Sequence, residues 1–197
     1  MVASYSSDWL SSLGNALKQT PTAECLRAAA ITGNLREWTR LLTAVVVSSC
    51  EVLGWRAAAR GHKLNVLPQS GQEYLGIDVM AFASDTTATW PFPLAAFELE
   101  NQGERAAYSL WKVICVQAEL RVVFAYRKDW DHVQELVQSL KREVVDGYSI
   151  VQRQSLGDEI LLVTGSRGEG ETFPNGFFKI WRLNSNTGSF ERLANWG

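Results

Sequence analysis

The spacing of apolar residues in this chain changes from a helical period to a strand period and back, which restricts the fold to a sheet covered by helices. In 34–55, Trp38, Leu42 and Val46 share one helical stripe, and the same spacing returns in 104–119. Apolar runs of strand length lie between and after these helices. The predicted helices are 7–17, a segment beginning at Thr20, 34–55, 104–119 and 130–145.

The strand-like segments predict one mixed sheet. The predicted strands are 63–67, 73–82, 94–101 and 120–126, followed by 148–153, 159–165, 177–183 and 189–193. The last four are expected to be antiparallel, with a hairpin turn from Asn184 to Gly188. We therefore expect an α+β fold, a mixed sheet flanked by helices with a β-rich C-terminal extension. A single domain is expected over 1–197, with an α/β core at 1–147 and the extension at 148–197.

The composition is typical of a globular protein and gives no overall signal for nucleic acid. Of the 197 residues, 46% are hydrophobic and 20% are charged, and the formal net charge is −2. Any contact with a polyanion therefore needs a local basic patch. Cys25, Cys50 and Cys115 lack the spacing of a zinc site or a disulfide framework. The sequence shows neither a basic-then-apolar leader nor an apolar run of membrane length, so we expect a cytoplasmic protein without a membrane partner.

Three acidic residues on two neighbouring predicted strands form the strongest candidate site. Asp78 lies in the second predicted strand, and Glu98 and Glu100 lie in the third. Because strand side chains alternate between faces, Glu98 and Glu100 emerge on the same side. Carboxylates on apolar strands repel one another and lose hydration, and a hard divalent cation offsets both costs. Asp78, Glu98 and the Leu99 carbonyl are therefore predicted metal ligands, with Glu100 as a further ligand or as the base that orients water.

The same acids also allow a purely structural interpretation. Glu98 and Glu100 could point to solvent from an edge strand, where acidic residues are ordinary. Asp78 could cap a turn or pair with Arg56 or Arg60. Bulky apolar residues share the strand face of Asp78, however, and a solvated face rarely has that composition.

At this point the chain resembles the PD-(D/E)xK nuclease superfamily, whose fold is restriction endonuclease-like. The resemblance covers residues 35–126, in the order helix, three strands, helix, strand. By position, Asp78 resembles the motif aspartate and Glu98 the motif glutamate, which implies that both bind metal. Glu51, in the preceding helix, resembles an extra metal-binding acid of many members. Glu100 stands where the motif has lysine, as in some restriction endonucleases, and would be catalytic there.

Two basic residues could supply the positive charge of the missing motif lysine. In some members of the superfamily that lysine lies on the following helix, and Lys112 is the matching candidate for a catalytic residue. Arg105 is closer in sequence and suits a phosphate contact at the mouth of a nucleic-acid site. Ile77 also departs from the pattern, because it replaces the motif proline.

Three functions of different classes are consistent with these features. The first is an enzyme, a nuclease dependent on Mg²⁺ or Mn²⁺ that cleaves DNA in preference to RNA, with a homodimer as one way to cut two strands. The second is a catalytically inactive member of the same fold that serves as a binding or assembly subunit. The third is a β-rich protein-interaction domain that uses Phe173, Phe177, Phe178 and Trp181, unless these aromatics simply cover the sheet.

Overall fold

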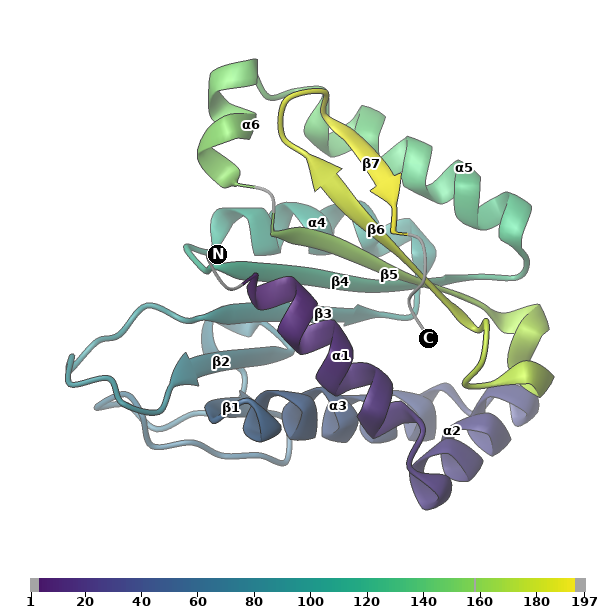
Figure 1. Cartoon of the computed structure of the whole chain (residues 1–197), viewed down its shortest axis with the longest axis horizontal. Coiled ribbons are helices and arrows are strands. Elements are labelled where there is room, and N and C mark those ends of the chain that lie inside the picture. The colour runs from purple at the N-terminus through teal and green to yellow at the C-terminus, as the bar shows by residue number, and fades with distance from the viewer. Residues whose placement is uncertain (1–3, 158, 194–197) are drawn as a thin grey trace.

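The centre of the protein is a seven-stranded mixed sheet whose strands lie in chain order, β1 to β7 (Figure 1). The computed structural model describes residues 4–157 and 159–193. β1, β2 and β3 are antiparallel neighbours, β3, β4 and β5 are parallel, and β5, β6 and β7 are antiparallel. The expected α+β class, a mixed sheet flanked by helices, is confirmed.

The elements are α1 (Tyr5–Leu17), α2 (Thr20–Thr32), α3 (Leu35–Val52), β1 (Trp55–Ala59), η1 (Tyr74–Gly76), β2 (Val79–Ala83), β3 (Ala95–Glu100), η2 (Gly103–Arg105), α4 (Ala106–Cys115), β4 (Leu120–Arg127), α5 (Trp130–Leu140), η3 (Lys141–Val145), α6 (Ile150–Leu156), β5 (Ile160–Ser166), η4 (Arg167–Thr172), β6 (Phe178–Asn184) and β7 (Ser189–Arg192).

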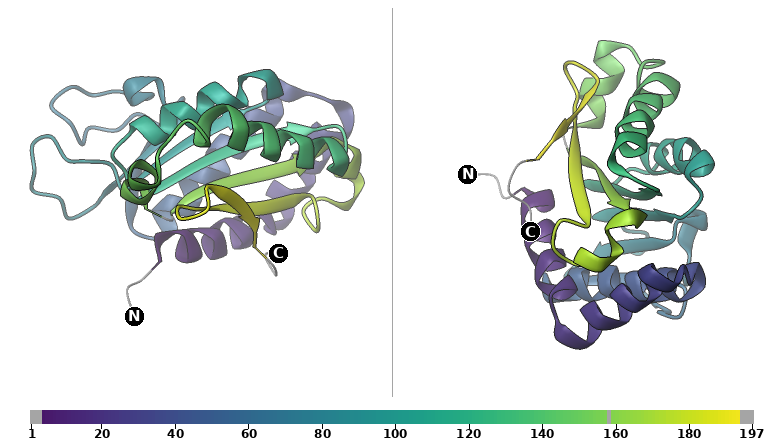
Figure 2. Two further views of the ribbon diagram at one scale, coloured as in Figure 1. Left: turned by 90° about the horizontal axis from the view of Figure 1, so that it is seen from above. Right: turned by 90° about the vertical axis from the view of Figure 1, so that its right-hand side faces the viewer.

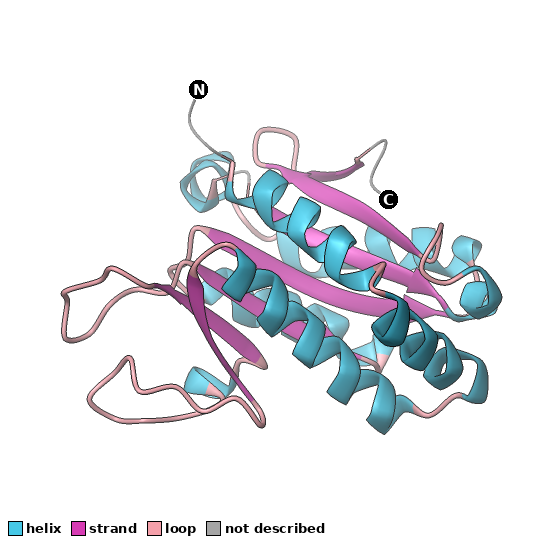
Figure 3. Cartoon of the chain, turned by 60° about the horizontal axis from the view of Figure 1, so that its bottom comes forward, coloured by secondary structure: helices cyan, strands magenta, loops and turns pink. Residues whose placement is uncertain are grey.

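Helices cover both faces of the sheet and create two apolar layers, seen from two sides in Figure 2. α1, α2 and α3 pack on one face, against alternate strand residues such as Phe97 and Phe124. α4, α5 and η3 pack on the other face, against the intervening residues such as Ala96 and Val123. β4 is buried on both faces, as its continuous apolar run predicts. Figure 3 shows the long central strands between the two helical layers.

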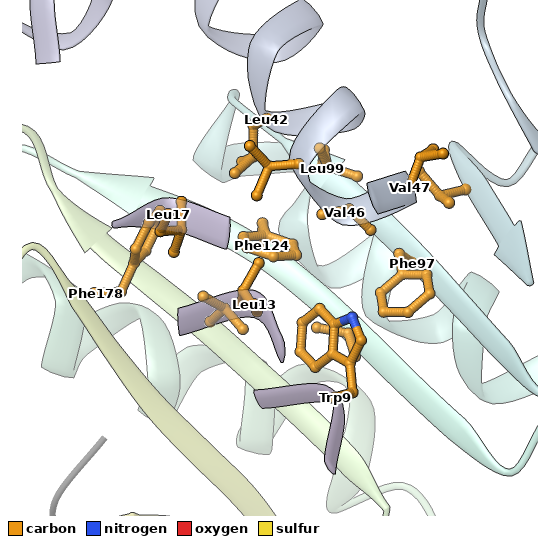
Figure 4. Packing of buried hydrophobic residues seen from close by; sticks show 14 of the residues in the cluster. Trp9, Leu13, Leu17, Leu42, Val46, Val47, Phe97, Leu99, Phe124 and Phe178 are labelled. Atoms are coloured by element: carbon orange, nitrogen blue, oxygen red, sulfur yellow. The ribbon is translucent and has the colours of Figure 1, made fainter. Parts of the chain in front are cut away.

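The layer under α1 and α3 is held by aromatic packing around one tryptophan. Trp9 of α1 is fully buried, and its ring lies 5.0 Å from the ring of Phe97 on β3 (Figure 4). Its indole N–H donates a hydrogen bond to the hydroxyl of Ser49 on α3, at 2.9 Å. The polar end of this large side chain is thus satisfied, so its full area can be buried without an unpaired donor. This contact fixes α1 and α3 relative to the central strands.

The first strand of the sheet is not the one that the sequence predicts. Residues 63–67 lie in the long connection between β1 and β2, where Leu64 makes only an isolated bridge to Gly71. The strand is instead Trp55–Ala59, and its first residue falls at the end of the predicted helix 34–55. Its alanines favour a helix intrinsically, but here they are buried in the sheet beneath α3. Tertiary packing has overridden local propensity.

The C-terminal part differs from the expected antiparallel extension. Residues 150–156 form α6 rather than a strand, and β5 lies parallel to β4 and so continues the central sheet. β6 and β7 are antiparallel, as expected. Ser149 caps α6 in a reciprocal hydrogen-bonding arrangement with Gln152, a Ser-x-x-Gln signature that marks a helix start. The pattern was present in the sequence and outweighs the short apolar run that suggested a strand.

The C-terminal aromatics cover the sheet instead of forming an exposed surface. Phe173, Phe177 and Phe178 are buried and pack around Trp38 of α3. Trp181 is partly buried, and its indole N–H donates to the Thr164 hydroxyl at 2.9 Å. The three phenylalanines therefore cover the sheet, as the alternative interpretation of these aromatics predicts.

Candidate active site

The acidic residues meet where β1, β3, β4 and β5 reach their C-terminal ends; we call this side of the sheet the carboxyl edge. Asp78 immediately precedes β2, which runs antiparallel to β3, so it lies beside the last residues of β3. Glu98 lies near the end of β3 and is only 4% exposed. β3 is a central strand, between β2 and β4. The interpretation of Glu98 as a solvent-facing residue on an edge strand is therefore excluded.

Asp78 is held by a backbone group of β3. The pairing of β2 with β3 ends at Val79 opposite Phe97, so the next backbone groups of β3 have no strand partner on that side. The carboxylate of Asp78 takes that place and accepts a hydrogen bond from the N–H of Leu99 at 2.8 Å. A strand residue directs its N–H and C=O to the same side, so the Leu99 carbonyl also faces the space next to Asp78.

Lys112 of α4 lies across Glu98. Its ammonium nitrogen is 2.7 Å from Oε1 of Glu98 and donates a hydrogen bond to the carbonyl of Gly76 at 2.8 Å. The contact with Glu98 is an ion pair, and the ammonium of Lys112 is the cationic neighbour of the buried Oε1. The helix that covers the sheet thus brings a lysine to the two acids, as the migrated motif lysine predicts.

The site carries more negative than positive charge. Burial, with a smaller contribution from the charge of Asp78, raises the pKa of Glu98 to about 7 against the opposing effects of Lys112 and Ser109. Burial likewise raises the pKa of Asp78, to which Glu73 and Glu100 add, against the Leu99 N–H and Lys112. Lys112 therefore compensates only part of the negative charge. Buried carboxylates whose negative charge is only partly compensated tend either to bind a proton or to bind a further cation.

Glu100 and Arg105 have different surroundings from the trio formed by Asp78, Glu98 and Lys112. Glu100 accepts hydrogen bonds from the N–H of Gln102 at 2.7 Å and from the hydroxyl of Ser109 at 3.4 Å. Both of its oxygens are therefore engaged at the start of α4, and its role in orienting water stays a prediction. Arg105 is exposed in η2, directly after β3, where its predicted phosphate contact is sterically open.

A cleft of about 760 Å³ opens from Asp78 towards the N-terminal half of α3. Glu37 of α3 lines this cleft together with Asp78. Glu51, the helix acid expected to bind metal, is exposed at the other end of α3, roughly 20 Å along the helix axis from Glu37 at 1.5 Å per residue. The structure therefore does not bring Glu51 to the trio. The sequence offered no means of choosing between the two acids, because the choice depends on the direction in which α3 crosses the sheet.

Six arginines also gather at the carboxyl edge. They are Arg36, Arg40, Arg60, Arg105, Arg127 and Arg167. The first three line the cleft with Asp78, and the others lie at or directly after the ends of β3 and its parallel neighbours. These residues are scattered along the chain, so no basic cluster is visible in the sequence. The sheet brings them together with acids, since Glu37, Glu73 and Asp78 line the same cleft and Arg40 is paired with Glu37. The carboxyl edge therefore carries both signs of charge.

The donor set fits Mg²⁺ or Mn²⁺ better than a soft metal. Among residues 4–157 and 159–193, no three His, Cys, Asp or Glu side chains are grouped closely enough to hold a metal by themselves. Asp78, Glu98 and the Leu99 carbonyl offer oxygen only. Mg²⁺ commonly uses one or two carboxylates and completes its shell with water and phosphate oxygens, so this small set is sufficient. Asp78 and Glu98 share one lysine, and this excess of negative charge is the observation that favours a further cation here.

Comparisons with protein-family models, curated protein sequences and solved structures give no match to this chain. In the part of the chain that the structure describes, no helix is both long enough and apolar enough to cross a membrane. The case for a function therefore depends on the geometry of the carboxyl edge.

Proposed function

We propose that this protein is a nuclease of the PD-(D/E)xK type, an enzyme that uses Mg²⁺ or Mn²⁺ to cleave phosphodiester bonds, with DNA preferred to RNA as substrate. The observation that carries the proposal is the meeting of Asp78, Glu98 and Lys112 at the carboxyl edge. Asp78 comes from the turn before β2, Glu98 from β3 and Lys112 from α4, and each position corresponds to an expected role in that superfamily. Arg36 and Arg60 line the cleft beside Asp78 and would give a polyanionic substrate cationic contacts.

Each residue has a distinct part in such a reaction. Asp78, fixed by the Leu99 N–H, and Glu98 would hold the metal ion, which when bound supplies a Lewis acid and lowers the pKa of water. Lys112 would stabilise negative charge on the phosphate, since its ammonium already lies at the two acids. Glu100 is the predicted residue for orienting water, and Arg105 for holding a phosphate.

Cleavage of a supercoiled plasmid and of a circular single strand tests this proposal. Purified protein should cut at least one of them with Mg²⁺ or Mn²⁺ and neither of them with EDTA. Asp78→Asn and Lys112→Met should each reduce the rate on the order of a hundredfold or more, because each removes a group that acts in the transition state. Glu51→Gln is the matched control and should keep the wild-type rate. Equal rates for wild type and Asp78→Asn would point to a contaminating nuclease and remove the claim.

One observation favours the second candidate, an inactive binding or assembly subunit. Glu98 is buried and already paired with Lys112, so the trio could serve the fold without binding metal. Calorimetric titration with Mn²⁺ separates the two functions. An enzyme should bind the metal, and Asp78→Asn should abolish the heat of binding; a purely structural trio should give no heat in either protein.

A further inference from the structure

Two aromatic side chains stand exposed on α4, the helix that carries Lys112. Tyr108 is 58% exposed and Trp111 is 47% exposed, whereas other residues of α4 form the face that packs on the sheet. The two aromatics are three positions apart, so they are neighbours on one side of the helix. Their rings are stacked, with centroids 5.8 Å apart and planes inclined by 28°. We call Tyr108 and Trp111 the aromatic pair.

The aromatic pair leaves ring surface open to solvent. Mutual stacking takes up one face of each ring, and the exposed fractions of the two residues show that much of the remaining surface is uncovered. A single exposed aromatic residue is ordinary, but the solvent side of a helix normally carries polar side chains. Two stacked rings here form a flat apolar surface, which is the kind of surface on which a planar heterocycle stacks.

The aromatic pair adjoins the trio on the same face of the sheet. Glu98 points to the face that α4 covers, since its neighbours Phe97 and Leu99 belong to the opposite apolar layer. The ammonium of Lys112 lies 2.7 Å from Oε1 of Glu98 and 5.8 Å from the centre of the Tyr108 ring. A phosphate beside Lys112 would therefore have the aromatic pair within the length of one nucleotide.

Cationic and aromatic side chains alternate along this side of α4. Arg105, Tyr108 and Lys112 are spaced as i, i+3 and i+7, so they follow one stripe that begins in the exposed turn before the helix. Glu104 is also exposed at this end, so phosphates would be held by contacts with single cations rather than by a general positive field. Cations for the backbone, interleaved with rings for the bases, are typical of surfaces that bind single-stranded nucleic acid.

We infer that the aromatic pair stacks against an unpaired base of the polynucleotide, next to the phosphate at the trio. This inference rests on the proposed function and specifies its substrate class: a single strand, or a strand with unpaired bases at the point of cleavage, in preference to intact duplex. In a duplex each base is paired and stacked between its neighbours, so it must leave the stack before a protein ring can cover it. The contact does not select a sequence, because every base has a flat π-face.

Fluorescence anisotropy of labelled oligonucleotides in EDTA tests the inference without any cleavage. The probes are a DNA single strand, the duplex of the same sequence, and a strand of the same length made of abasic nucleotides. Wild type should bind the single strand more tightly than either of the others. Trp111→Leu should weaken binding of the single strand about five- to hundredfold, the usual contribution of a ring stacked on one base, and leave binding of the abasic strand unchanged.

Two further variants make the test specific. Trp111→Phe keeps a ring at the same position and should retain most of the affinity, which separates stacking from an effect on folding. Trp90→Leu is the matched control, because Trp90 is 64% exposed in the connection that enters β3 at the end opposite the carboxyl edge. Trp90→Leu should bind all three probes as wild type does.

The outcomes separate this inference from the proposed function. Equal losses on the single strand and the abasic strand in Trp111→Leu would overturn the inference, as would no loss on either or a duplex bound as tightly as the single strand. An unchanged affinity would assign the aromatic pair to a protein partner instead. The expected binding pattern in a protein that fails to cut nucleic acid would support the base contact and contradict the nuclease proposal alone.

Discussion

At the scale of single residues, the protein buries a carboxylate whose charge is only partly compensated. Glu98 is 4% exposed, and its Oε1 lies 2.7 Å from the ammonium of Lys112. The charge of Asp78 also acts on Glu98 and raises its pKa. Two acids that share one lysine are unfavourable for the fold, and such groups are typical of a ligand site.

The raised pKa of Glu98 leads to a prediction for stability against pH. The folded pKa, about 7, lies above the model value of 4.5, so between these values the folded state holds a proton that the unfolded state has lost. The free energy of unfolding should therefore fall as pH rises from about 4.5 to about 7, by an amount on the order of 2 kcal/mol. Urea unfolding across this range measures the slope, which should be shallower in Glu98→Gln.

Two comparisons keep the pH experiment specific. The pKa of His132 is raised by hydrogen bonding to Asp129, so its titration also lowers stability as pH rises, but equally in wild type and variant. Glu119→Gln removes an exposed carboxylate outside the site and controls for charge. An identical slope in wild type and Glu98→Gln would show that Glu98 is ionised throughout this range. Mg²⁺ at about pH 8 should raise the stability of wild type and of Glu119→Gln but not of Glu98→Gln, because only the ionised acids at the site can bind it.

At the scale of elements, α3 and α4 determine which side chains reach the carboxyl edge. α4 carries Lys112 over β3 and ties it to Gly76, in the turn before Asp78. α3 begins beside the cleft, where Asn34 caps the helix by accepting a hydrogen bond from the Glu37 N–H at 3.2 Å. The start of α3 therefore positions the cleft.

Removal of this cap should have a graded effect. Asn34→Ala should lower the free energy of unfolding by about 1 kcal/mol, whereas Asn34→Gly should lower it by only about a few tenths, because glycine leaves the first N–H groups open to water. Thermal or urea unfolding followed by circular dichroism gives both values. Equal losses for the two variants would mean that the Asn34 side chain contributes by packing rather than by capping.

The helices and strands also show which parts of the fold the sequence patterns could predict. Long periodic segments predicted α3, α4, α5 and β4 close to their observed bounds, and strand alternation placed Glu98 and Glu100 on one face. The patterns failed where packing decides, as at β1, whose alanines form a strand only because α3 covers them. The sequence patterns predict that Asp78, Glu98 and Lys112 lie close together. They do not predict that Glu37 lines the cleft, because the path of α3 over the sheet depends on contacts between distant parts of the chain.

At the scale of the whole molecule, charge is distributed unevenly. The formal net charge is −2, yet six arginines gather at the carboxyl edge. Glu37, Glu73 and Asp78 line the cleft beside three of these arginines, so a polyanion bound there would depend on contacts with individual arginines. Such binding should weaken steeply with salt.

A matched pair of arginines on one strand tests this distribution. Arg60 follows the end of β1 and lines the cleft, whereas Arg56 is exposed near the start of the same strand. Arg60→Gln should weaken oligonucleotide binding and reduce the slope of log affinity against log salt by about 1. Arg56→Gln should change neither. Equal effects of both substitutions would show that the attraction is general rather than confined to the carboxyl edge.

The chain order of the strands has a consequence for how the protein acquires its shape. Every strand lies next to the strand that precedes it in the chain, so each new strand can be added at the edge of the part already formed. Asp78, Glu98 and Lys112 all lie within residues 78–112, so they can come together before the last three strands have left the ribosome.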